Sequence, residues 1–239
     1  MGVLLNHPDF TVDPSFDVVT GTSLAYDGVA DSIGGVWNTT DDEYQETLGA
    51  NILQSDDFTM VARVRVNSIP TQGIVTFGGG RSTSTGVVEF CVSLYNNTGG
   101  ADVIDRAVMQ VFDTSGVAQG VPSNRPFANW DVTVDTDVLL TWTYLAAPPA
   151  FPGPTWQLVA QSYPDLTPIG DTVQSTFGGS GTSWEMEHFG LATETDFKAA
   201  STADMDVFGL RIFSGATQTN KSISTSATNF NSSIKLEVL

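Results

Sequence analysis

The chain has 239 residues, of which 9 are basic and 27 acidic, so its formal net charge is −18. A surface of this charge repels nucleic-acid phosphates and anionic lipid headgroups, so the composition excludes a basic nucleic-acid binder and disfavours polybasic membrane attachment. Cys91 is the only cysteine, which excludes an intrachain disulfide framework. Hydrophobic residues make up 41% of the chain, which is enough for a packed core.

The first residues carry no basic cluster and no sustained apolar run, so they do not resemble a secretory signal. No stretch approaches the roughly 18 apolar residues that would span a bilayer as a helix. We therefore expect a protein that is made without a signal peptide and has no membrane partner.

Apolar residues recur with a period of two along most of the chain, which is typical of strands, and helical periodicity is nearly absent. In the clearest run, 57–67, alternate apolar residues from Phe58 to Val66 predict a core face, and the residues between them predict a largely solvated face. Taken in chain order, strands are predicted at 23–29, 57–67, 73–77, 87–95, 107–112, 138–144, 156–161, 184–191, 204–213 and 233–238.

Turn residues separate these runs. Glycine- and asparagine-rich segments lie at 78–80, 96–100 and 178–181, and a proline-rich loop lies between the strands at 138–144 and 156–161. About ten strands at this spacing predict an all-β, antiparallel two-sheet β-sandwich. We expect a single domain over 1–239, with a jelly-roll core at about 23–213 and extended terminal segments at 1–22 and 214–239.

The order of these segments resembles the concanavalin A-like lectin and glucanase superfamily, in particular laminin-G-like modules. The resemblance covers roughly 23–213 and is carried by three segments: the strand 57–64 with 73–78, the hairpin 140–144 with 156–160, and the run 188–191 followed by 204–213. It implies a jelly roll. It does not by itself imply an activity, because one fold serves many functions.

Glu185 and Glu187 are the candidate catalytic pair. Residues two apart on a strand share a face, and retaining glycosidases need two carboxylates about 5–5.5 Å apart. Glucanases of the resembled superfamily usually carry three alternating acids, and here Phe189 occupies the third position. A solvent-facing strand edge, kept wet by its charges, is the favoured interpretation of the pair. His188, in the same segment, alternates with Met186 and is expected to face the core or an interface.

Acidic clusters in loops are candidate Ca²⁺ sites, because Ca²⁺ prefers oxygen ligands and loops at the sandwich rim often bind it in the resembled superfamily. The main candidate is the group Asp41, Asp42 and Glu43, and the pairs Asp56 with Asp57 and Asp102 with Asp105 are two others. The spacing matches no defined calcium loop, and acidic turns are common in so acidic a chain.

Trp37, Trp130 and Trp156 are candidate carbohydrate-binding residues, because the faces of sugar rings stack on exposed aromatic rings. Most tryptophans in a sandwich are core anchors instead.

Three function hypotheses follow. The first is a non-enzymatic structural and adhesion protein of a virion, such as a phage capsid decoration or tail protein, which works within a larger assembly and contacts capsid or tail subunits and surface glycans. Jelly rolls recur in viral shells, and no catalytic set is evident. The second is a calcium-dependent, lectin-like carbohydrate-binding module, acting extracellularly. The third is a glucanase-type glycoside hydrolase. Only the second requires a cofactor, Ca²⁺.

Overall fold

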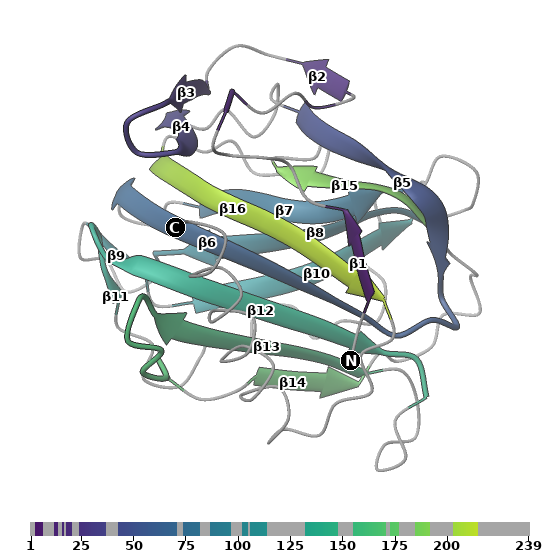
Figure 1. Ribbon diagram of the computed structural model, residues 1–239. Coiled ribbons are helices and arrows are strands. Elements are labelled where there is room, and N and C mark those ends of the chain that lie inside the picture. Colours follow the sequence, from purple (N-terminus) through teal and green to yellow (C-terminus); the bar gives the residue numbers. More distant parts are fainter. Residues whose placement is uncertain are drawn as a thin grey trace.

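A computed structural model of the chain shows two layers of strands (Figure 1). The residues that it describes are 3–6, 12–13, 16, 18–20, 24–36, 43–70, 74–81, 87–96, 102–104, 106–113, 132–147, 155–170, 173–176, 185–191 and 203–214. Their regular elements are strands: β1 Val3–Asn6, β2 Val18–Thr20, β3 Ala25–Asp27, β4 Ser32–Val36, β5 Glu43–Leu53, β6 Phe58–Ser68, β7 Ile74–Arg81, β8 Val87–Tyr95, β9 Val103–Ile104, β10 Arg106–Asp113, β11 Val132–Thr133, β12 Asp137–Leu145, β13 Thr155–Ser162, β14 Val173–Thr176, β15 Glu185–Leu191 and β16 Asp204–Ser214. Among these residues there is no helix long and apolar enough to cross a membrane.

The strands form two antiparallel sheets, which confirms the predicted all-β sandwich. Sheet A has eight strands, in the order β14-β13-β12-β6-β16-β4-β3, and β1 also pairs with β16. Sheet B has six strands, in the order β10-β8-β7-β15-β5-β2, and β9 and β11 form a small third pair. Sheet A lies in front of sheet B in Figure 1.

The core fills the space between the sheets. The core face predicted for β6 is confirmed, and β12 faces the same core: the inward residues of both strands are at most 4% exposed and belong to one buried cluster. Within this core, the rings of Phe58 and Tyr144 stack with their centroids 5.5 Å apart. The inward residues of these two strands are Phe58, Met60, Ala62, Val64, Val66, Val138, Leu140, Trp142 and Tyr144.

The order of strands along the chain does not by itself give the order in the sheets. The predicted hairpin of β12 and β13 is confirmed, with Leu140 opposite Ala160. In contrast, β6 and β7, which follow one another in the sequence, lie in opposite sheets. Of the predicted strand 23–29, residues 25–27 form β3, and residues 28 and 29 belong to the turn that leads to β4. The predicted strand 233–238 lies outside the described residues.

The outward face of sheet A differs from the solvated face predicted for it. Thr141 and Thr143 of β12 are 2% and 1% exposed, and Val61 of β6 is 4% exposed. The hydroxyl groups of Thr59 and Thr143 lie 3.1 Å apart and form a hydrogen bond between β6 and β12. The outward side chains of β12 at the centre of sheet A are therefore buried, as is the neighbouring Val61 of β6.

A charged cluster lies on this outward face, at the Ser68 end of β6. Asp137 of β12 accepts hydrogen bonds from Arg63 and Arg65, including one of 3.1 Å from Arg63 Nε. The Arg63 guanidinium lies 4.0 Å from the ring centre of Tyr163 and 4.4 Å from that of Phe208. One carboxylate and two rings therefore fix the arginines in place.

Strand β15 breaks the regular alternation of a strand. Met186 and Phe189 are both 0% exposed although they are three residues apart. Met186 is opposite Ile52 of β5, but His188 is opposite Thr47, so the segment 48–51 of β5 faces the single residue Glu187. This bulge in β5 changes which face the following residues of β15 present. Phe189 therefore lies in the core and does not continue the line of Glu185 and Glu187.

Candidate functional site

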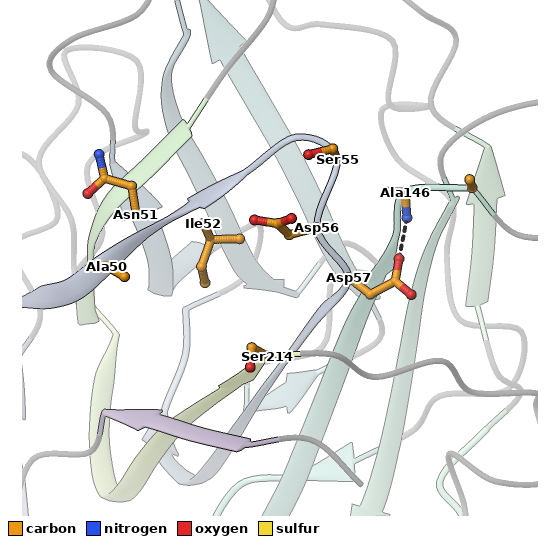
Figure 2. Close-up of a pocket in the computed structure, with 9 residues that line it drawn as sticks. Ala50, Asn51, Ile52, Ser55, Asp56, Asp57, Ala146 and Ser214 are labelled. Atoms are coloured by element: carbon orange, nitrogen blue, oxygen red, sulfur yellow. Dashed lines mark hydrogen bonds between the residues drawn. The ribbon is translucent and has the colours of Figure 1, made fainter.

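The described residues line an open pocket of about 590 Å³ at one end of the sandwich. Sheet B contributes the bulge of β5, the β5–β6 turn closes one side, and sheet A contributes the ends of β12 and β16 (Figure 2). The volume is within the range of about 300–1,000 Å³ that is usual for small-molecule sites. Its lining consists of Ala50, Asn51, Ile52, Ser55, Asp56, Asp57, Ala146, Ala147 and Ser214.

Three hydrogen bonds hold the β5–β6 turn in place. Asp56 Oδ2 accepts a bond of 2.9 Å from the amide of Leu53, and Asp57 Oδ1 accepts one of 2.8 Å from the amide of Ala146. The Tyr144 hydroxyl donates a bond of 2.9 Å to the carbonyl of Gln54. These contacts tie the turn to β12, so both aspartates are positioned before any ligand arrives.

The lining combines hydrogen-bonding groups with apolar surface. Figure 2 shows the Asp56 carboxylate pointing toward Ile52, with Ser214 on the opposite wall. Within the described part of the chain, no hydrogen bond occupies the second carboxylate oxygen of Asp56, the Asn51 amide or the Ser214 hydroxyl. The lining contains two carboxylates and no basic residue. Such a set suits a ligand that carries hydroxyl groups and C–H faces together.

The pKa of Tyr144, whose hydroxyl binds the β5–β6 turn, is affected by its burial and by the charge of Asp57. Burial, and to a lesser degree the charge of Asp57, raise the pKa of Tyr144 well above its ordinary value of 10.0. Both causes act in the same direction, because each disfavours a tyrosinate anion at this position.

We expect alkaline pH to destabilise the protein through Tyr144. Because the folded-state pKa is raised, the contribution of neutral Tyr144 is fully present below pH about 10 and is lost as pH rises further, when the unfolded chain releases a proton that the folded chain keeps. Urea unfolding between pH 8 and 11.5 should show a decline that is steeper in the wild type than in Tyr144→Phe, by up to about 1.4 kcal/mol per pH unit.

At neutral pH, the same variant should lose about 0.5–1.5 kcal/mol of unfolding free energy, because the hydrogen bond to Gln54 is gone. Equal alkaline slopes for the two proteins would contradict the role assigned to Tyr144.

The sequence-predicted binding residues are only partly within the described structure. Trp37, Trp130, Asp41 and Asp42 lie outside the described residues. Trp156 lies on β13, and its backbone is opposite Tyr144 and Ser175. Glu43 corrects the sequence prediction of an acidic loop, because it begins β5 and pairs with Thr20 of β2. Across the described ranges, no three histidine, cysteine or acidic side chains gather as metal ligands would.

The candidate catalytic pair, on β15, is not part of the pocket lining, although Glu185 is opposite Leu53, the neighbour of the lining residue Ile52. Glu185 and Glu187 are both partly exposed, and Met186 between them is buried. His188, which was expected to face the core or an interface, is partly exposed, and its buried Nδ1 finds no hydrogen-bond partner among the described residues. This part of β15 therefore lacks the third acid in line that the glucanase pattern requires.

The sequence analysis identified Asp56 and Asp57 as an acidic pair but missed the rest of the pocket. Asn51, Ala146 and Ser214 are far apart in the chain, and no local pattern marks them. Leu48, Ala50 and Ile52 keep a spacing of two, so the sequence gives no sign of the bulge.

No protein-family model matches the chain, and no curated protein matches its sequence. Among solved structures, the CBM2 module of the evolved Dit of Lactobacillus casei BL23 phage J-1 matches with a TM-score of 0.55 and 13% identity, over 89% of this chain and 95% of that module. The alginate lyase of Aplysia kurodai matches with a TM-score of 0.48 and 7% identity, over 77% and 83% of the two chains. The Bauhinia forficata lectin in complex with GalNAc matches with 0.46 and 11%, over 91% and 100%. The match to the phage module shows that the two chains share a β-sandwich fold.

Proposed function

We propose that this protein is a non-enzymatic, carbohydrate-binding adhesion module of a bacteriophage particle. The observation that carries the proposal is the pocket at the end of the sandwich, in which carboxylate, amide and hydroxyl groups surround Ile52 and three alanines. Sugars present hydroxyl groups at the edge of the ring and C–H groups on its faces, so this lining matches both. The similarity in fold to a module of a phage Dit supports the particle context.

A glycan microarray tests the binding function directly. The full chain, fluorescently labelled, should bind a defined subset of glycans, and free sugar of the same kind should compete. Absence of binding to every glycan would remove the proposal. Repeating the array with a chelator tests the calcium-dependent alternative: signals that persist support metal-independent binding, and signals that disappear support the Ca²⁺ lectin.

Association with particles tests the second half of the proposal. The protein should co-sediment with phage tails or capsids and remain attached after washing at moderate salt. If the protein does not co-sediment with any tail or capsid preparation, the proposed role in the virion is wrong. The proposed carbohydrate binding would then stand alone.

The hydrolase alternative rests on Glu185 and Glu187, and the interrupted alternation of β15 does not favour it. We therefore expect no release of reducing ends from a panel of β-glucans. If the wild type releases reducing ends and the variants Glu185→Gln and Glu187→Gln do not, the protein is a glycoside hydrolase and the proposed function is wrong.

A further inference from the structure

The geometry of the pocket points to the class of sugar that it takes. We infer that it binds neutral or amino sugars through Asp56 and Ser214 and rejects sugars that carry an acidic group. This inference rests on the proposed carbohydrate-binding function and adds to it a site and a selectivity.

Asp56 and Ser214 are placed so that they can hydrogen-bond to one sugar ring. Asp56 uses Oδ2 to cap the turn at Leu53, which fixes the carboxylate, and Oδ1 accepts no hydrogen bond from the described residues. A fixed carboxylate oxygen is a strong acceptor for a sugar hydroxyl. Ser214 lies on the facing wall, at the end of β16, and its hydroxyl both donates and accepts (Figure 2). A ring placed between the two walls can therefore be held at both edges.

Apolar side chains line the pocket between these two groups and can contact the C–H face of a sugar. Ile52 lies beside the Asp56 carboxylate and is 3% exposed, so it closes the base of the pocket, and the accessible apolar surface comes from the alanines. Ala50, Ala146 and Ala147 leave the pocket wide. Small side chains at these positions account for space that a six-membered ring can enter.

The negative charge of the pocket lining disfavours acidic sugars. Asp56 and Asp57 are adjacent, the lining has no Lys, Arg or His, and the whole chain carries −18. A uronate or sulfated sugar would bring a third negative group into this space, within the distance at which like charges repel. An ammonium group, as in glucosamine, would instead be attracted. The pocket should thus rank ligands by charge even when their rings are the same.

The experiment measures binding of three ring-matched probes by calorimetry at low salt: methyl galactoside, galacturonate and galactosamine, with the corresponding glucose series in parallel. In at least one series, the wild type should bind the uronate at least tenfold more weakly than the neutral sugar, and the amino sugar at least as tightly. The difference should shrink at high salt. A uronate that binds as well as the neutral sugar, or an amino sugar that binds more weakly, would overturn the inference.

The decisive variant is Asp56→Asn, which keeps an acceptor for the Leu53 amide and removes the charge. Its affinity for the neutral sugar should fall at least tenfold, and its ratio of neutral to uronate binding should approach one. Asp27→Asn is the matched control, because Asp27 caps an exposed turn in the same way at Val29, on the far edge of sheet A. It should leave both measurements unchanged.

Ala147→Trp provides an independent second variant, because a large ring at this exposed lining position fills the pocket without removing a hydrogen bond. It should abolish binding while thermal unfolding stays close to that of the wild type. If the array shows glycan binding and both variants bind like the wild type, the pocket is not the site and the proposed function stands. If no glycan binds at all, the proposed function itself fails.

Discussion

Replacing Phe189 by alanine should lower the free energy of unfolding by about 3–5 kcal/mol, as is usual for an aromatic side chain removed from a core. Phe189 is 0% exposed, and it lies with Met186 between the sheets. The position is informative because uninterrupted alternation along β15 would place Phe189 on the surface beside Glu187. The bulge in β5 is what brings it inside.

Urea unfolding measures this effect, with Val29→Ala as the control. Val29 is 96% exposed, so losing part of an apolar side chain there should change stability by less than about 0.5 kcal/mol. A change of that small size for Phe189→Ala would show that β15 alternates without a break. Phe189 would then share a face of β15 with Glu185 and Glu187.

Replacing Asp137 by alanine should cost about 2–3 kcal/mol of unfolding free energy. Asp137 is 10% exposed and is the common acceptor for Arg63 and Arg65, so both guanidinium groups would lose a charge-assisted hydrogen bond. The loss stays below that of a fully buried pair, because the arginine side chains are 27% and 38% exposed and retain water.

The sign of this effect distinguishes the local contact from the overall charge. Removing one carboxylate from a chain at −18 reduces self-repulsion, which alone would stabilise the fold slightly. Asp165→Ala makes the same change in net charge at an exposed position and should be neutral or slightly stabilising. Equal stability of the two variants would mean that the Arg63–Arg65–Asp137 cluster contributes nothing beyond net charge.

Much of the fold could be predicted from the sequence because burial and strand period are local properties. The inward faces of β6 and β12 follow directly from alternation between Phe58 and Val66 and between Val138 and Tyr144. The division of strands between sheets could not be predicted in this way, since β6 and β7 are neighbours in the chain and belong to different layers. Nor could the burial of Thr141 and Thr143, because hydroxyl residues usually indicate a solvated face.

The candidate site was predictable only in part. Asp56 and Asp57 attract attention as an acidic pair, but a pair of acids in a turn is common in such a chain. They form a candidate site only together with Asn51 and Ser214. These two residues line the same pocket because β5 bulges and β16 ends there. Long-range convergence of this kind leaves no trace in the spacing of residues along the sequence.

The bulge of β5 also has a consequence for how the pocket can change in evolution. The strand is held at both ends, by Ile52 opposite Met186 and by Thr47 opposite His188, and the residues between lack such partners on β15. Insertions or deletions in 48–51 would therefore alter one wall of the pocket without shifting the pairing on either side. Gly49 even has room for a side chain, since an added Cβ would meet no atom within 4 Å. Ligand preference can thus diversify at this point while the sandwich that presents it stays constant.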